Sequence, residues 1–179
     1  MTRAGCVRAV WVRLVMGADP LKSDPLKSGL LVAALVTVLD QLSKWVVLVM
    51  VMDPPRIIPV TPFFNLILVW NRGVSFGFLG QASSDWVPWL LTALALAIMA
   101  VLAWWLRQAT NRLMMLALGL VIGGALGNVI DRLRFGEVVD FLDFYIARFH
   151  WPAFNVADAA ITVGAALILY DALFVSRAP

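Results

Sequence analysis

The sequence is poor in the side chains that most metal sites and nucleophilic enzymes require. Its 179 residues include one cysteine, Cys6, and one histidine, His150. A single cysteine cannot form an intramolecular disulfide. One cysteine and one histidine also argue against a structural zinc site and against Cys–His or Ser–His nucleophilic catalysis. We therefore predict that the protein uses no metal and no cofactor, and that carboxylates carry out any chemistry.

Charged residues are scarce as well. They make up 14% of the chain, the formal net charge is +3, and no polybasic run indicates binding to nucleic acid. Hydrophobic residues make up 62%, whereas soluble domains are roughly 45–50% apolar. A soluble fold of this composition would expose large apolar patches. The composition therefore predicts an integral membrane protein.

Four apolar segments are long enough to cross a bilayer as helices. We place the spans at about residues 30–52, 86–106, 113–131 and 154–174. Four spans put both ends of the chain on one side of the membrane. Eight basic residues fall on that side (Arg3, Arg8, Arg13, Lys22, Lys27, Arg107, Arg112, Arg177) and five on the other (Arg56, Arg72, Arg132, Arg134, Arg148). The positive-inside rule then places the termini in the cytoplasm.

The chain divides into three parts. Residues 1–28 form an amino-terminal extension that contains the tandem repeat "DPLKSDPLKS", and its Pro, Ser and charged residues are typical of a flexible linker. Residues 29–176 form the four-span membrane domain, and residues 177–179 are a short tail.

The two outer loops contain extended segments. "FFNLILVW" within residues 56–80 and "EVVDFLDFYI" at residues 137–146 favour strands. We therefore expect a membrane α-helical fold with four transmembrane helices and a small extracytoplasmic antiparallel β-sheet. Open sheet edges cannot face lipid tails, so the sheet should lie at the membrane interface.

Five carboxylates lie in apolar sequence near the outer end of a span or in an outer loop: Asp40, Asp131, Asp140, Asp143 and Asp158. Helical spacing puts Asn128, Asp131 and Arg132 on one face at the end of the third span, and puts Asn155 and Asp158 on one face at the start of the fourth. Glycines at every fourth position of the third span, from 119 to 127, permit close packing against a neighbouring helix.

Structural interpretations account for three of these carboxylates. Asp40 and Lys44 are an i, i+4 pair, which favours an ion pair on the first span. Asp131 either forms a local pair with Arg132 or orients its neighbours. Asp143 is expected to be a solvated residue at the rim of the sheet.

The other two carboxylates favour function. Asp158 has no basic residue within one helical turn, and ionisable residues inside a span usually mark a functional site; the alternative is an interhelical staple bonded to asparagine. Asp140 is the single charge on one face of a strand with Val138, Leu142 and Phe144. This argument for Asp140 fails if the segment is helical.

Two carboxyl groups placed close together share a proton and titrate as a pair. The ionised member can accept a proton from water while the neutral member polarises a carbonyl group, as in aspartic proteases. A small proton-coupled transporter could use the same groups and is the alternative. The spacing leaves both Asp131 and Asp140 as candidate partners of Asp158.

Five ordered segments resemble the lipoprotein signal peptidases of bacteria: "DQLSK" (40–44), "NRGVSFG" (71–77), "GGALGNVIDR" (123–132), "VVDF" (138–141) and "FNVADAAI" (154–161). The resemblance implies a multi-pass enzyme of the bacterial inner membrane whose site faces outward. It implies an aspartic endopeptidase that removes signal peptides from diacylglyceryl-modified prolipoproteins and cuts before the lipidated cysteine. Its partners would be these substrates and membrane lipid, and we expect it to act as a monomer.

The resemblance also assigns roles to single residues. It places the catalytic pair on Asp140 and Asp158. Substrate binding or support of the pair would fall to Asn71, Asn128, Asp131, Arg132, Asn155, Asp40 and Lys44.

Overall fold

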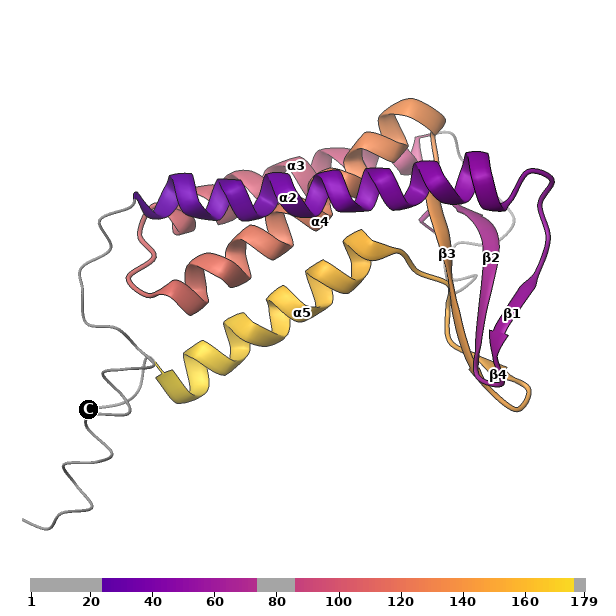
Figure 1. Cartoon of the computed structure of the whole chain (residues 1–179). Coiled ribbons are helices and arrows are strands. Elements are labelled where there is room, and N and C mark those ends of the chain that lie inside the picture. Colours follow the sequence, from indigo (N-terminus) through magenta and orange to yellow (C-terminus); the bar gives the residue numbers. More distant parts are fainter. Residues whose placement is uncertain (1–23, 74–85, 176–179) are drawn as a thin grey trace, which may run out of the picture.

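The computed structural model describes residues 24–73 and 86–175. Within these ranges four helices are long and apolar enough to cross a membrane. They are α2 (Pro25–Val46), α3 (Val87–Leu106), α4 (Arg112–Phe135) and α5 (Val156–Tyr170). Short π-helical turns, Val47–Val51 and Asp171–Val175, extend α2 and α5 (Figure 1). The four predicted spans are therefore confirmed as apolar, membrane-length helices.

Two helix boundaries differ from the prediction. α2 begins at Pro25, so the last residues of the supposed flexible extension are helical. The Asp24 side chain accepts a hydrogen bond from the Leu26 N–H at 3.0 Å, and proline fits the first turn because it has no N–H to leave unpaired. α4 continues beyond residue 131 to Phe135 and ends at Gly136, whose φ of 76° is a left-handed cap.

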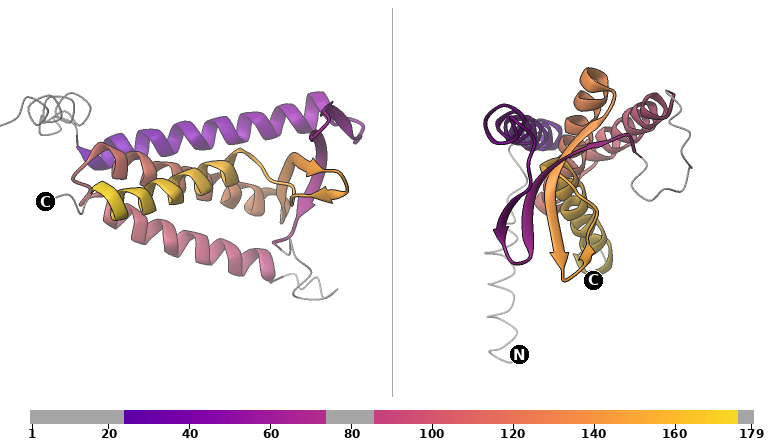
Figure 2. Two further views of the ribbon diagram at one scale, coloured as in Figure 1. Left: turned by 90° about the horizontal axis from the view of Figure 1, so that it is seen from below. Right: turned by 90° about the vertical axis from the view of Figure 1, so that its right-hand side faces the viewer.

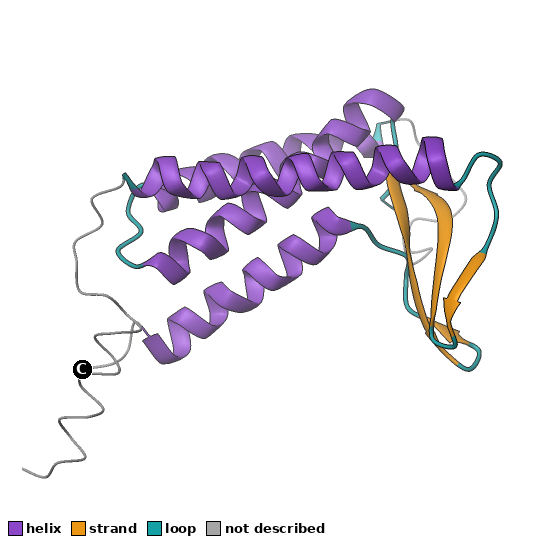
Figure 3. Ribbon diagram, viewed as in Figure 1, coloured by secondary structure: helices purple, strands orange, loops and turns teal. Residues whose placement is uncertain are grey.

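A four-stranded antiparallel sheet lies across one end of the helices, which we call the sheet end (Figures 1 and 3). Its strands, in both spatial and chain order, are β1 (Ile58–Thr61), β2 (Phe64–Asn71), β3 (Val138–Ile146) and β4 (Phe149–His150). The β1–β2 hairpin follows α2, and the β3–β4 hairpin connects α4 to α5. The predicted sheet is confirmed, although part of the 56–80 segment lies outside the described residues.

The helix α4 is the centre of the bundle, and its glycines bring it close to two neighbours. A Cβ atom added to Gly123 would lie 2.8 Å from the Cα of Ala33 on α2. One added to Gly124 would meet the Ala157 carbonyl oxygen on α5, and one added to Gly164 would lie 2.7 Å from the Ala117 carbonyl oxygen on α4. Small residues therefore set the approach of α4 to both helices.

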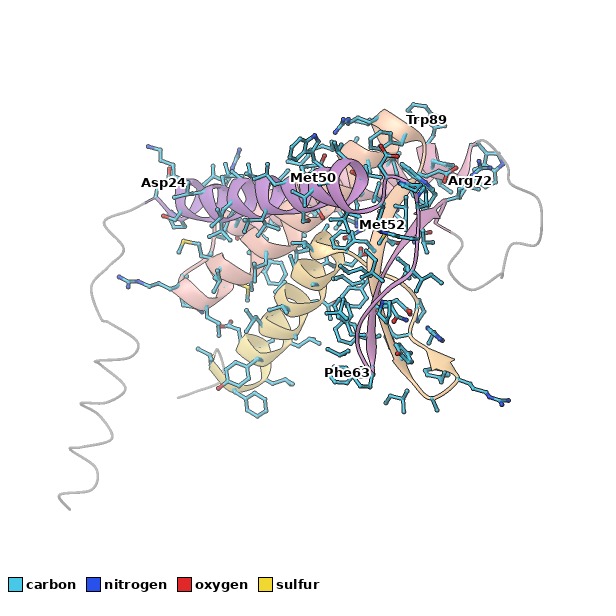
Figure 4. The ribbon with its side chains drawn as sticks, turned by 45° about the vertical axis from the view of Figure 1, so that its right-hand side comes forward. Asp24, Met50, Met52, Phe63, Arg72 and Trp89 are labelled. Atoms are coloured by element: carbon cyan, nitrogen blue, oxygen red, sulfur yellow. The ribbon has the colours of Figure 1, made fainter. Side chains whose placement is uncertain are left out.

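The sheet is anchored to the end of α2 by a small apolar core. Met52, labelled in Figure 4, is 2% exposed and packs with Val47, Val139 and Phe141. The view along the helices in Figure 2 shows the strands crossing in front of the helix ends. The residue after Val139 is Asp140, so this core fixes the backbone of β3 beside the candidate site.

Large apolar side chains cover the outside of the helices. Trp89 on α3 is 61% exposed and Met50 is 67% exposed (Figure 4). Exposed apolar surface on this scale matches a bilayer rather than water.

Candidate active site

Asp140 lies on β3 and is 1% exposed. Its Oδ2 accepts a hydrogen bond from Asn71 Nδ2 at 2.8 Å, and its Oδ1 accepts one from Asn155 Nδ2 at 2.7 Å. The segment is a strand, so the condition on which the prediction for Asp140 depended is met. The amide of Asn71 is held in this orientation because its Oδ1 accepts the Gly73 N–H at 2.7 Å.

Asp158 lies in the first turn of α5, at the sheet end of the bundle. Asn155 caps this helix, since its Oδ1 accepts the Asp158 N–H at 2.9 Å while Asp158 Oδ2 accepts the Asn155 N–H at 3.3 Å. This reciprocal pair is a capping box. The Asp158 carboxylate accepts a second hydrogen bond, from Asn128 Nδ2 to its Oδ1 at 2.7 Å.

Two asparagines connect the carboxylates of Asp140 and Asp158. Asn155 donates to Asp140 and caps the turn that carries Asp158. Asn155 Nδ2 also lies 3.2 Å from Asn128 Oδ1, and Asn128 donates to Asp158. The fold therefore brings together residues from β3, α4 and α5 that the sequence placed on separate elements.

The environment of Asp140 favours its protonated form. Burial raises the pKa of the Asp140 carboxyl to about 6, and the negative charge of Asp158 adds to this rise. The hydrogen bonds from Asn71 and Asn155 oppose it, because they stabilise the ionised form. A carboxyl with this pKa is poised to give and take protons near neutral pH.

Lys44 connects α2 to the residues around Asp140 and Asp158. Its Nζ lies 2.8 Å from Asp40 Oδ2 and 2.8 Å from Asp131 Oδ2, and all three side chains are buried. The predicted Asp40–Lys44 ion pair is confirmed. Of the two interpretations left open for Asp131, the structure supports the second, because Asp131 Oδ2 also accepts the Val139 N–H at 3.1 Å. Asp131 thus orients the strand residue next to Asp140.

Lys44 also determines how the Asn128 amide is turned. Asn128 Oδ1 lies 3.2 Å from Lys44 Nζ and 3.2 Å from Asn155 Nδ2, both of which are donors. The oxygen must face these two donors, so the Nδ2 group is left to face Asp158. A buried lysine on α2 therefore controls a donor to the carboxylate on α5.

Two residues of α2, Asp40 and Gln41, give further support. Asp40 Oδ1 accepts the Ala157 N–H at 2.9 Å, which fixes the start of α5. Gln41 Nε2 donates to Asp131 Oδ1 at 2.9 Å and to the Gly127 carbonyl at 3.2 Å. Gln41 was missed by the sequence analysis, although a polar amide beside Asp40 in an apolar span was a usable signal.

Arg132 is half-buried beside these groups. Its Nη1 lies 3.5 Å from the Asn128 carbonyl oxygen, which is a marginal hydrogen bond. Its Nε is buried and has no hydrogen-bond partner among the described residues. This unsatisfied donor suits an acceptor atom of a bound molecule.

The prediction for Asp143 is wrong. Asp143 is 4% exposed and lies on β3, where its carboxylate accepts a hydrogen bond from Asn65 Nδ2 at 2.9 Å and contacts His150 Nδ1 at 2.8 Å. The partners come from β2 and β4, so only the strand register shows that this carboxylate is buried.

A metal site has no basis in the described part of the chain. Residues 24–73 and 86–175 contain no group of three or more His, Cys, Asp or Glu side chains placed to hold an ion. The polar groups that the site offers to a bound molecule are its carboxylates, amides and guanidinium group.

Comparison with known proteins identifies the family. Residues 32–174 match the family model described as signal peptidase (SPase) II. The chain is 51% identical over 142 residues to the lipoprotein signal peptidase of Cupriavidus necator, covering 79% of this chain and 80% of that protein. It is 48% identical over 155 residues to the enzyme of the same name from Polynucleobacter necessarius, covering 86% and 93% of the two chains.

A solved structure of a bacterial membrane enzyme has the same fold. It superimposes with a TM-score of 0.72 at 31% sequence identity, covering 83% of this chain and 94% of that one. The family is one of peptidases, which decides against the transporter alternative. The chain therefore belongs to the signal peptidase II family and is a multi-pass membrane peptidase.

Proposed function

We propose that the protein is an aspartic endopeptidase that removes signal peptides from diacylglyceryl-modified prolipoproteins, with Asp140 and Asp158 as its catalytic pair. The bond cleaved is the one before the lipidated cysteine. The observation that carries the proposal is the convergence of these two carboxylates on Asn155 and Asn128. The curated relatives named lipoprotein signal peptidase support the substrate class.

The two carboxylates differ in burial, and this difference suits one neutral and one ionised member of a catalytic pair. Asp140 is fully buried, and burial raises its pKa to about 6, which suits the member of the pair that carries the shared proton. Asp158 is only half-buried and sits in the first turn of a helix, where the helix dipole stabilises negative charge. We assign Asp140 as the neutral member of the pair and Asp158 as the ionised member.

The reaction then follows from these protonation states. Asp158 accepts a proton from water while the water oxygen attacks the scissile carbonyl carbon, and the Asp140 proton goes to the carbonyl oxygen. The tetrahedral intermediate collapses when the carbon–nitrogen bond breaks, and the leaving amine takes the proton held by Asp158. Asp140 regains its proton from the collapsing hydroxyl group, so the pair returns to its starting state.

The surrounding residues hold the peptide and the pair. Arg132 Nε has no hydrogen-bond partner among the described residues, and we assign it to a backbone carbonyl of the substrate. Asn71, Asn128 and Asn155 orient the carboxylates. Lys44 fixes Asn128, Asp40 fixes the start of α5, and Asp131 fixes strand β3.

The location of the site suits a lipid-anchored substrate. Both carboxylates lie at the sheet end of apolar helices, where a cysteine that carries two acyl chains can reach them without leaving the bilayer. We place the sheet end on the outer face of the inner membrane, as the distribution of basic residues predicts. A single chain supplies both carboxylates and every supporting residue, so we expect a monomer to be active.

The test is single-turnover cleavage of a lipid-modified precursor at saturating substrate. We expect Asp140→Asn and Asp158→Asn each to reduce the rate by about 10²–10⁴-fold or more, because each removes a general acid or base. Both variants should still insert and bind a lipopeptide, since asparagine has nearly the same volume. Addition of EDTA should leave the wild-type rate unchanged.

Asp131→Asn is the matched control, because Asp131 is another buried carboxylate of the same network. We expect it to lower the melting temperature and to keep measurable turnover. Substantial turnover in Asp140→Asn, together with none in a well-folded Asp131→Asn, would assign the pair to Asp131 and Asp158. Loss of activity in EDTA that zinc restores would overturn the aspartic mechanism.

A further inference from the structure

A second buried carboxylate, Asp143, lies on the strand that carries Asp140. It bridges three strands, because it accepts a hydrogen bond from Asn65 on β2 at 2.9 Å and contacts His150 on β4 at 2.8 and 3.0 Å through its two oxygens. The proposed reaction gives none of these three residues a role. A buried carboxylate is costly unless such partners compensate it, so its retention requires an explanation.

The Asp143–His150 contact supports the short strand β4. It has only two residues, and its register consists of the pairs Tyr145–His150 and Ile146–Phe149. A hairpin with so short a second strand has little stability from its backbone alone. The Asp143–His150 contact, the stacking of His150 on Tyr145 at 4.9 Å between ring centroids, and the Trp151 N–H donated to the Phe144 carbonyl at 2.8 Å hold β4 against β3.

The hairpin lies on the chain path between the two catalytic carboxylates. After β4 the chain returns along β3, where the Phe154 N–H donates to the Leu142 carbonyl at 3.1 Å and the Leu142 N–H donates to the Phe154 carbonyl at 2.9 Å. The next residue is Asn155, which donates to Asp140 and caps the helix of Asp158. The chain that leaves β4 therefore leads along β3 directly to the residue that connects Asp140 and Asp158.

From this geometry we propose that Asp143 and His150 are positioning residues of the peptidase: their contact closes the β3–β4 hairpin and thereby sets the placement of Asn155 between Asp140 and Asp158. The inference rests on the proposed function, since it takes Asp140 and Asp158 as the catalytic pair. Asn65 fixes the other side of Asp143, so the carboxylate cannot rotate away from His150.

Two substitutions of similar chemistry test the contact. His150→Asn keeps an N–H donor close to the position of Nδ1, whereas His150→Gln moves that donor to the position of Nε2. We expect His150→Gln and His150→Ala to lower kcat by about tenfold or more with KM within about twofold of wild type, because a shift of about 1 Å in a catalytic group can reduce the rate about 10²-fold. His150→Asn should retain most of the wild-type kcat.

Arg148→Ala is the control, since Arg148 is an exposed residue in the turn of the same hairpin. It should match wild type in kcat, KM and melting temperature. The inference is overturned if His150→Gln and His150→Ala both keep wild-type kcat, or if His150→Asn falls as far as His150→Gln. If His150→Ala does not fold, the comparison of kcat between His150→Asn and His150→Gln still tests the proposal. Turnover in Asp140→Asn would instead refute the proposed function, so the two failures are distinguishable.

Discussion

The two ends of α4 both carry buried polar groups, but they use them differently. At the end opposite the sheet, Asn111 caps the helix by accepting the Met114 N–H at 2.7 Å and donates to Asp171 at 2.9 Å. Asp171 is 2% exposed and lies just after α5, so this contact joins the first turn of α4 to the end of α5. It connects two helices and has the character of a structural clamp.

At the sheet end, the polar groups form a wider network. Lys44 on α2 contacts Asp40 and Asp131, and it orients the amide of Asn128, which donates to Asp158. The network also reaches strand β3, and beside it the Arg132 Nε has no hydrogen-bond partner within the part of the chain that the structure describes. Burial of a carboxylate near the end of a span is therefore not enough to indicate catalysis. The informative features are convergence from several elements and a donor left unpaired.

The largest expected effect that separates the two ends comes from Lys44→Met. The variant removes the cation between Asp40 and Asp131 and leaves two buried carboxylates without it. Breaking a buried ion pair by removing one partner costs about 3–5 kcal/mol. We expect a large fall in the melting temperature in detergent and loss of cleavage in whatever protein remains folded.

Lys44→Arg is the conservative control for this change. It keeps the charge but replaces a compact ammonium group with a larger planar one. We expect partial recovery of stability with reduced turnover, because the guanidinium cannot reproduce all three Nζ contacts. A Lys44→Met protein with wild-type stability and rate would show that the network on α2 does not support the site.

A smaller effect is expected when a change of pH alters the protonation of Asp140 and with it the stability of the folded protein. Burial raises its pKa to about 6 in the folded protein, compared with about 3.9 for an unperturbed aspartate. The folded state therefore binds this proton more tightly than the unfolded state. The stabilisation is fully present below pH about 4 and is lost as the pH rises through about 6, and a shift of about two units corresponds to about 3 kcal/mol.

This dependence is measured as a difference between wild type and Asp140→Asn, which lacks the titrating group. Wild type should become less stable relative to the variant as the pH is raised from 4 to 8, whatever the constant offset between the two proteins. Melting temperatures of both proteins at five pH values give the stability difference as a function of pH. A difference that does not change with pH would mean that Asp140 is not held in its protonated form by the fold.

Much of the architecture was predictable from composition and hydropathy, because lipid-facing helices and interfacial strands have distinct patterns. The start of α2 was missed although its signal was present: Asp24 followed by Pro25 is a helix cap followed by a first-turn proline. The repeat in which this pair occurs was interpreted as a linker, so the local cap signal was overlooked.

The candidate site was predictable only in part. Asp140 and Asp158 could be selected from the strand face and the apolar context of each residue. The partners of Asp143 and the Lys44–Asp131 contact could not, since each joins residues from elements far apart in the sequence. Contacts of that kind depend on strand register and helix packing, which hydrophobic periodicity does not determine.

The smallest expected effect lies at the end opposite the sheet and completes the comparison. Asn111→Ala removes the cap of α4 and the donor to Asp171, and loss of a helix cap costs about 0.5–2 kcal/mol. We expect a modest fall in the melting temperature, while kcat and KM for a lipid-modified precursor stay at their wild-type values. Asn111→Asp separates the two contributions, because it keeps an oxygen for the Met114 N–H but places a second carboxylate against Asp171. If Asn111→Ala lowers kcat as strongly as the substitutions of Lys44 do, the two ends of α4 are coupled, and the separation of clamp and catalytic site drawn from the structure is wrong.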